Sequence, residues 1–245
     1  MTSDEFAAFY NSYGSRFAEA SAKSIFHKYL EKPAVRRLLC GQIADRLVLD
    51  IGCGTGVLSE WLATSGGIVT AIDCSQEMVA IASEQCAQLS RITFKCCPLA
   101  KFQPSISFDT VVASFMLGYF SSLPEFFEQA ARILNQNGVL VASMLHPVRT
   151  KASARTKLGY VVDNYFDRCR YMSDFLGTDA IIPLYVWDFE DVVSAAVDNG
   201  FVLDALVEPH LSRQTAIEQD IDEFYCNAPS VAAFRFRRIS EVGED

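Results

Sequence analysis

A glycine-rich loop between two apolar segments constrains the fold of this chain more than any other feature. Residues 48–56 read Val-Leu-Asp-Ile-Gly-Cys-Gly-Thr-Gly, so an apolar run carries an acid, Asp50, and then meets three glycines. A helical pattern begins at Val57. Glycine lets backbone amides approach a ligand closely, and a strand followed by a helix is the context that such a loop needs. The stretch therefore predicts an α/β fold with a ligand at the end of its first strand.

A second acid follows the first at a spacing that is typical of nucleotide-binding folds. The apolar run 68–72 ends on Asp73, 23 positions after Asp50. This is near the spacing at which a carboxylate on the second strand of a nucleotide-binding fold receives a ribose. The alternative role for Asp73 is a helix cap. Together with the glycine loop, the two acids indicate a cofactor that contains a nucleoside.

The spacing of the glycines narrows the class of cofactor. A dinucleotide loop reads G-x-G-x-x-G, whereas here the glycines stand at 52, 54 and 56 and are followed by Val57. Asp50 would also face a doubly negative pyrophosphate. A P-loop is excluded because no Gly-Lys-Ser/Thr follows the loop. The acid suits a ligand that carries a sulfonium and an ammonium group, and S-adenosylmethionine is such a ligand.

These motifs resemble those of the class I S-adenosylmethionine-dependent methyltransferases. Residues 48–56 are similar to the first motif of that family, and 71–75 followed by Met78 are similar to its second. Residues 108–114 resemble its fourth strand, and 132–138 resemble the turn before its fifth strand. The resemblance implies a doubly wound, mostly parallel, seven-stranded Rossmann-like sheet.

The alternation of strand and helix patterns from residue 47 to residue 144 independently predicts a parallel sheet with helices on both faces. A helix is expected from Ser75, another from Ser122, and a third over 189–199. Ser122 and Glu125 would form a capping box, and Asn137-Gly138 would end that helix. The expected strands are 47–51, 68–72, 91–96, 108–114 and 138–144, followed by 201–207 and 231–238, and the resemblance implies that these last two form an antiparallel edge.

Two aromatic-rich segments lie outside this core. Residues 1–42 are expected to form a helical cap, and residues 148–185 interrupt the sheet pattern as an insert after strand five. Their aromatic side chains could be ordinary core, or could form an apolar lid over a substrate. A chain of 245 residues fits one domain over 1–245.

The resemblance also implies which residues contact the cofactor. Asp50 would orient the methionine ammonium, and Asp73 would accept hydrogen bonds from the ribose hydroxyls. Met78 would flank the adenine, although packing in a helix core is an equal alternative. Pro98 stands where the family often has an aspartate, so backbone or water would bind the adenine amine. The full expected set is Asp50, Gly52, Cys53, Gly54, Asp73, Cys74, Met78, Pro98, Leu99, Ser114 and Phe115.

Catalysis by methyl transfer makes few demands on side chains. The nucleophile must be held in line with the methyl carbon, and a base is needed only if the nucleophile arrives protonated. His146 is the candidate base or substrate-orienting residue, because residues 143–147 resemble a Ser-x-x-His-Pro motif of small-molecule methyltransferases. A structural hydrogen bond to its loop is the alternative role of His146. His27 and His210 are expected to be structural or at the surface. The aromatic residues expected at the substrate are Tyr13, Tyr119, Tyr160 and Tyr165.

Charge and cysteine content bear on partners and location. The net charge of −9 disfavours nucleic acid, and a short basic cluster, residues 235–238, is expected to be solvated. None of the eight cysteines has zinc-site spacing, so no metal and only reduced thiols are expected. No signal-peptide pattern and no apolar run of membrane length occurs, which favours a cytoplasmic protein.

The expected function is transfer of a methyl group from S-adenosylmethionine to an O, N or C nucleophile of a small, apolar or aromatic metabolite. A tRNA-modifying methyltransferase is the alternative, and the acidic charge weighs against it. A binder without catalysis is disfavoured because the acids and glycines of the cofactor motifs are intact. The acceptor and the oligomeric state stay open.

Overall fold

The structure is a computed structural model. It describes residues 1–156, 159–167, 170–174 and 180–239. Parts of the predicted insert, namely 157–158, 168–169 with Cys169, and 175–179, lie outside the described residues.

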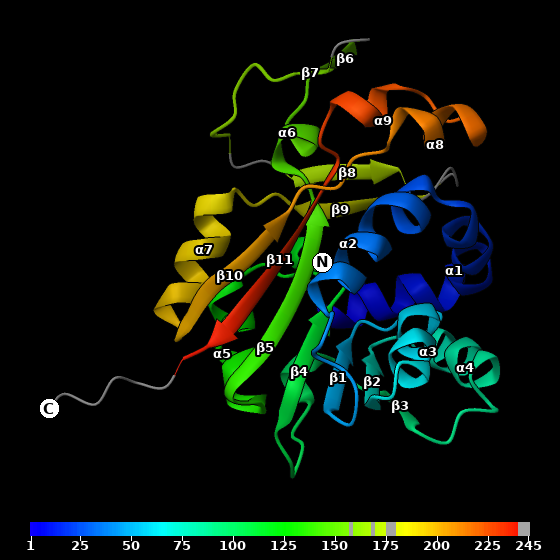
Figure 1. Cartoon of the computed structure of the whole chain (residues 1–245), viewed down its shortest axis with the longest axis vertical. Coiled ribbons are helices and arrows are strands. Elements are labelled where there is room, and N and C mark those ends of the chain that lie inside the picture. Colours follow the sequence, from blue (N-terminus) through cyan, green and yellow to red (C-terminus); the bar gives the residue numbers. More distant parts are fainter. Residues whose placement is uncertain (157–158, 168–169, 175–179, 240–245) are drawn as a thin grey trace, which may run out of the picture.

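Seven strands form one sheet in the order β10-β11-β5-β4-β1-β2-β3 (Figure 1). β11 is antiparallel to both of its neighbours, β5 and β10, and the other pairs are parallel. The predicted mostly parallel, doubly wound sheet with an antiparallel pair at one edge is therefore confirmed. The strands are β1 (Leu47–Ile51), β2 (Ile68–Asp73), β3 (Ile92–Cys96), β4 (Phe108–Ala113), β5 (Leu134–Leu145), β10 (Phe201–Val207) and β11 (Val231–Arg238).

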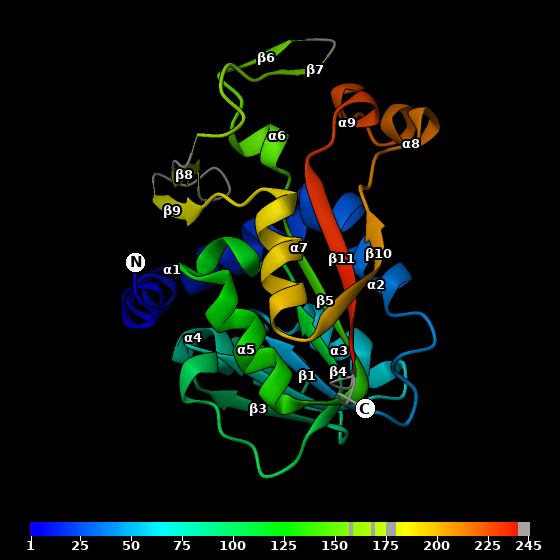
Figure 2. The ribbon, with the colours of Figure 1, turned by 90° about the vertical axis from the view of Figure 1, so that its left-hand side faces the viewer.

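Helices cover both faces of the sheet, and strand side chains alternate between the two apolar layers. In β1, Leu49 and Ile51 belong to the core that contains α5 and α7, whereas Val48 belongs to the core that contains α2 and α3. Figure 2 shows α5 and α7 over one face, with α3 behind the sheet. Burial on both faces explains why the central strands read as nearly continuous apolar runs. The helices are α2 (Lys32–Leu38), α3 (Val57–Thr64), α4 (Gln76–Gln85), α5 (Leu123–Ile133) and α7 (Phe189–Asp198).

The helix starts were predicted correctly, but the details of α5 differ. Ser122 is its N-cap and accepts a hydrogen bond from the Glu125 amide at 3.3 Å. The reciprocal half of the predicted capping box is not formed in the described structure, because Glu125 lines a cavity instead. The expectation that α5 ends at Asn137-Gly138 is wrong. β5 starts at Leu134, and Asn137, with φ of 62°, lies in the irregular beginning of that strand.

Helix α1 (Ser3–Lys23) of the cap and the insert lie over the C-terminal edge of the parallel strands (Figures 1 and 2), whereas α2 packs on one face of the sheet. The predicted helical cap is α1, a π-helix η1 (Phe26–Glu31) and α2. The described parts of the insert form two small antiparallel hairpins rather than loops. Its elements are α6 (Pro147–Thr150), β6 (Ala154–Thr156), β7 (Gly159–Val161), β8 (Arg170–Asp174) and β9 (Ile181–Tyr185).

Four short elements complete the chain: η2 (Leu99–Lys101), η3 (Leu117–Tyr119), α8 (Arg213–Glu218) and α9 (Phe224–Asn227). Among the described residues, none of the helices combines the length and apolar character that a membrane span requires.

Candidate active site

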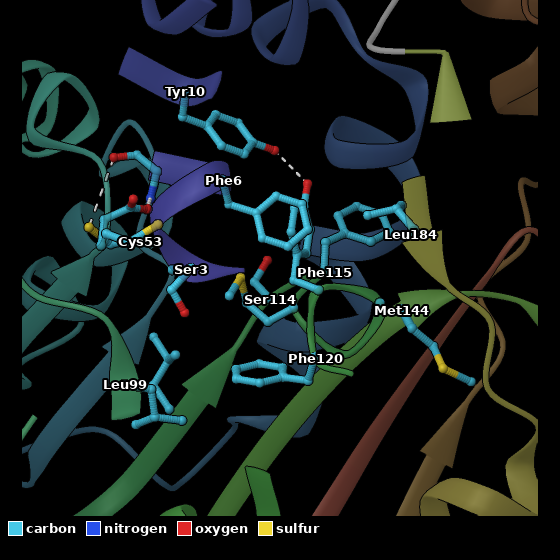
Figure 3. A pocket seen from close by; sticks show the side chains of 18 of the residues that line it. Ser3, Phe6, Tyr10, Cys53, Leu99, Ser114, Phe115, Phe120, Met144 and Leu184 are labelled. Carbon is cyan, nitrogen blue, oxygen red and sulfur yellow. Dashed lines mark hydrogen bonds between the residues drawn. The ribbon is translucent and has the colours of Figure 1, made fainter. Parts of the chain in front are cut away.

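A cavity of about 470 Å³ lies between the C-terminal edge of the sheet and the cap. Figure 3 shows Cys53 and Leu99 on one side of it and Met144 and Leu184 on the other, with Phe6 of α1 between them. Open parallel sheets bind ligands at this edge. The volume falls in the range of small-molecule pockets.

The glycine loop supplies the floor of the cavity. Gly52 and Gly54 have φ of 68° and 53°, a region that residues with a Cβ rarely adopt. A Cβ on Gly52 would also lie 2.2 Å from the Met116 sulfur. The Gly54 amide donates to the Asp73 carboxylate at 2.9 Å. The loop therefore needs glycine at these positions, and Asp73 holds it in place.

The two predicted acids both line the cavity. Asp50 is 1% exposed; its Oδ2 accepts from Ser59 Oγ at 2.5 Å, and its Oδ1 has no partner among the described residues. Burial, against the opposing hydrogen bond from Ser59 and with the help of the nearby Asp73 and Glu31, raises the pKa of Asp50 to about 7. Burial also raises the pKa of Asp73. Such a site favours a ligand group with positive charge.

Asp73 is not the cap of the following helix, which removes its alternative role. The N-cap of α4 is Ser75, whose side chain accepts from the Met78 amide at 3.2 Å. Asp73 instead accepts from the Ser75 amide at 2.9 Å and lines the cavity.

The remaining predicted cofactor residues also line the cavity. Met78 does so while being only 1% exposed, so that it serves the helix core and the cavity wall together. Burial raises the pKa of the Cys74 thiol to about 12, so the thiol stays protonated. The other predicted residues in the wall are Cys53, Pro98, Leu99, Ser114 and Phe115.

Glu31, a buried acid that was not predicted from the sequence, connects the C-terminal ends of β4 and β5. Glu31 of η1 is fully buried and accepts from Ser114 Oγ and from Ser143 Oγ, each at 2.7 Å. Ser143 Oγ in turn accepts from the Phe115 amide at 2.7 Å. This network fixes Phe115, whose φ is 54°, and joins the cap to β4 and β5.

Comparison with known proteins agrees with this geometry. A family model described as a methyltransferase domain matches residues 48–138. Over these residues the chain is similar to methyltransferase domains, and its fold is that of S-adenosylmethionine-dependent methyltransferases of known structure.

Sequence relatives cover part of the chain. A demethylmenaquinone methyltransferase of Tropheryma whipplei is 34% identical over 55% of this chain and 58% of that protein. A ubiquinone biosynthesis O-methyltransferase of Bradyrhizobium diazoefficiens is 33% identical over 46% of this chain and 44% of that protein. The chain thus spans about half the length of the curated relatives it matches.

A solved structure has the same fold as this chain over most of the length of both proteins. An S-adenosylmethionine dependent methyltransferase from Mesorhizobium loti has a TM-score of 0.72 and 24% identity, covering 85% of this chain and 97% of that chain. At this identity the likeness concerns the fold.

His146 lies outside the cavity wall. The ring is 4% exposed; Nδ1 accepts from the Val148 amide at 3.1 Å, and Nε2 lies 2.8 Å from a Glu208 oxygen. Burial lowers the pKa of His146, against the opposing effect of Glu208. Both ring nitrogens are engaged and His146 caps α6, so the geometry matches the structural alternative and gives no support to a base.

Three of the four predicted substrate tyrosines are also not among the cavity-lining residues. Tyr119 lines the wall, and its hydroxyl lies 2.5 Å from that of Tyr10. Tyr13 stacks on Phe9 with ring centroids 4.8 Å apart. Tyr160 bonds to Arg149 and Ser230, at 3.1 and 3.0 Å. Tyr165 contacts Lys151, whose ammonium lies 4.7 Å from the ring centroid.

The cavity-lining residues that were not predicted include three basic side chains, those of His27, Lys32 and Arg149. His27 stacks edge-on against Phe115 at 4.9 Å, and burial lowers its pKa to about 4. His27 lies in a π-helix, an irregular element that is often found at functional sites. Nothing in the local sequence predicts this π-helix. The sequence motifs lie at the sheet edge, whereas His27 and Lys32 lie in the cap and Arg149 lies in α6.

Proposed function

We propose that this chain transfers the methyl group of S-adenosylmethionine to a nucleophile of a small molecule with an apolar or aromatic body. The observation that carries the proposal is one cavity with two chemically different ends. Acids and the glycine loop line the first end. Aromatic and apolar side chains line the second: Phe26 comes from the cap, Leu184 and Tyr185 come from the insert, and Phe115, Met144 and Trp187 come from segments after β4, in β5 and after the insert.

The residues at the first end fit S-adenosylmethionine. The partnerless buried Oδ1 of Asp50 suits the ammonium group, and Asp73 suits the ribose hydroxyls. Gly54 leaves open space where a Cβ would stand, with the nearest atom, of Phe17, 3.8 Å away. Cys74, Met78, Pro98 and Leu99 form an apolar wall for a flat base. When bound, the cofactor supplies an electrophilic methyl group on sulfur.

The chain's own residues would position the acceptor and keep water out. S-adenosylmethionine held by Asp50, Asp73 and the glycine loop would supply its methyl group to the nucleophile of the acceptor, and its sulfur would keep the electron pair of the bond that is lost. A nucleophile that carries a proton must also give that proton up. His27 is neutral, with its pKa lowered to about 4, and lines the cavity. It is the residue placed to accept a hydrogen bond from the acceptor, a role that His146 cannot reach.

The aromatic wall supports a small acceptor. Trp187 donates to the Leu117 carbonyl at 3.0 Å and stacks on Tyr185 with ring centroids 6.1 Å apart. The described part of the insert therefore forms a fixed wall as well as a cover. Two relatives named above are methyltransferases of quinone biosynthesis, which also supports a small, flat acceptor. Exclusion of water by such an enclosure favours the displacement.

A transfer assay tests the proposal. The protein is incubated with S-adenosylmethionine labelled on the methyl group and with a metabolite extract, and labelled products are identified by mass spectrometry. We expect at least one labelled small molecule that depends on the protein and is absent with Asp50→Asn. Label confined to RNA would favour the tRNA alternative, and no label in any fraction would contradict the proposal.

A further inference from the structure

The end of the cavity opposite Asp50 and Asp73 contains a cation that is not paired with a carboxylate of any described residue. Arg149 belongs to α6, which follows β5 in the chain, and Arg149, Met144 and Leu145 all line the cavity. Arg149 forms no salt bridge with any residue in the described part of the chain. In a protein of net charge −9, a half-buried arginine without an acidic partner is unexpected, since buried charges are normally paired.

The contacts of Arg149 hold the guanidinium in place without using most of its donors. The guanidinium carbon lies 4.4 Å from the centroid of the Phe26 ring, a cation–π distance. Nη1 donates to the Tyr160 hydroxyl at 3.1 Å, and Tyr160 is itself held by Ser230 at 3.0 Å. Nε is buried and has no partner among the described residues. An arginine offers five N–H donors, so most of them are left for a ligand.

The charged side chains of the cavity wall differ between the two ends of the cavity. Among the described residues, its acidic side chains are those of Asp50, Asp73 and Glu125, and its cationic side chains are those of Lys32 and Arg149. Asp50 and Asp73 belong to the end that fits S-adenosylmethionine, which carries its positive charges there. Arg149 follows β5 and stacks on Phe26 of the cap, among the aromatic and apolar residues of the acceptor end.

We infer that the acceptor carries an anionic group, a carboxylate or a phosphate, which Arg149 binds. This inference rests on the proposed function. The guanidinium matches both anions through paired hydrogen bonds, and the surrounding aromatic wall matches an apolar or aromatic body. Phe26 and Tyr160 fix the side chain before the ligand arrives, which limits the entropy lost on binding. Arg149 is thus a specificity-determining residue, and it leaves the methyl-transfer step to the residues around the methyl group.

The first experiment needs no variant. A metabolite extract is separated at pH 7 on an anion exchanger into acidic and neutral fractions, and each fraction is incubated with the protein and methyl-labelled S-adenosylmethionine. We expect labelled product from the acidic fraction. Treating that fraction with phosphatase distinguishes the anions, because loss of the acceptor indicates a phosphate and retention indicates a carboxylate. Product from the neutral fraction alone would overturn the inference while leaving the proposed function intact.

The second experiment tests Arg149 itself with the acceptor so obtained. Arg149→Gln should raise KM for the acceptor by about tenfold to hundredfold, the scale of lost charge-assisted hydrogen bonds, with little change in the affinity for S-adenosylmethionine. Arg149→Lys keeps the charge without the paired donors and should retain part of the binding. An unchanged KM in folded Arg149→Gln would contradict the inference.

The matched control is Arg155→Gln. Arg155 also stacks on an aromatic ring, 3.9 Å from the Phe224 centroid, and contacts Asp222, but it is not a cavity-lining residue. KM for the acceptor should stay unchanged in this variant. If calorimetry with S-adenosylmethionine shows no binding to the unaltered protein, the proposed function fails and the inference falls with it. Binding of S-adenosylmethionine without product from either fraction would count against both.

Discussion

The hydroxyl oxygens of Tyr10 and Tyr119 lie 2.5 Å apart, which joins helix α1 to the segment that follows β4 (Figure 3). Both residues line the cavity, and burial raises the pKa of each hydroxyl, that of Tyr119 to about 12. The pair therefore stays protonated and holds the cap over the cofactor end of the cavity. Asn11 of the same helix adds a second attachment, since Ser75 Oγ donates to its side-chain oxygen at 2.7 Å.

This pair predicts a coupled effect on stability. Tyr10→Phe leaves the buried Tyr119 hydroxyl without its partner, which should cost about 1–3 kcal/mol. Replacing both tyrosines by phenylalanine should cost less than the sum of the single changes, because neither hydroxyl is then left unpaired. Urea unfolding of the four proteins measures this. Strictly additive free energies of unfolding would show that the two hydroxyls do not interact.

The raised pKa of Asp50 predicts how cofactor affinity depends on pH. Burial, assisted by Asp73 and Glu31, raises this pKa from 3.8 to about 7, so below pH 7 the carboxyl is largely protonated. A cationic ligand favours the ionised form and must displace the proton. Affinity should therefore rise between pH 5 and pH 7, by up to about tenfold per pH unit, and level off above.

Calorimetry with S-adenosylhomocysteine from pH 5 to pH 8 measures this dependence. Its thioether lacks the sulfonium charge, so the slope reports on the ammonium group. Asp50→Asn should bind more weakly and show a shallower slope, with Asp73 and Glu31 accounting for what remains. The same slope in Asp50→Asn as in the parent would assign the proton to another group.

His27 and His146 should respond differently to substitution. His27→Ala removes a side chain from the cavity wall, so turnover per folded molecule should fall by about tenfold or more, within the range for a group that assists proton transfer. His146→Ala removes the cap of α6 and the contact with Glu208, so the melting temperature should fall while turnover per folded molecule is kept. The reverse pattern would restore His146 as the catalytic histidine.

The chain should show no appreciable affinity for nucleic acid at physiological salt. The basic residues near its C-terminal end are largely engaged: Arg235 and Arg237 contact Asp204 at 2.8 and 3.1 Å, and Arg238 donates to the Leu134 carbonyl. A net charge of −9 then repels phosphate. Filter binding of total tRNA over a salt series measures this, and tight, salt-sensitive retention would support the tRNA alternative.

The sequence predicted the sheet well because its signals are local. β1, β10 and β11 begin and end where their apolar runs do, and the glycine loop marks the first strand end. The roles of Glu31 and His146 depend on residues far along the chain. Glu31 is 83 and 112 positions from its partners Ser114 and Ser143, and His146 is 62 positions from Glu208. A motif beside one strand could not reveal which way these side chains turn.

The structure of the insert could likewise not be predicted from its sequence. Its aromatic residues suggested a lid, but periodicity could not reveal the hairpins β6–β7 and β8–β9 or which aromatic residues reach the cavity. Tyr185 lines the wall and Tyr160 packs behind it, on Arg149 and Phe224. Short strands of this kind are determined by packing more than by pattern.

The most direct measurement is calorimetric titration of S-adenosylmethionine and S-adenosylhomocysteine into the protein and into Asp73→Ala. Asp45→Ala is the control, because the Asp45 side chain is 88% exposed and lies outside the cavity. We predict that both ligands bind the parent and the control alike. Asp73→Ala should lose about 1.5–3 kcal/mol, the scale of hydrogen bonds to a charged group. Absence of binding to the parent, or equal affinity in Asp73→Ala, would contradict the account.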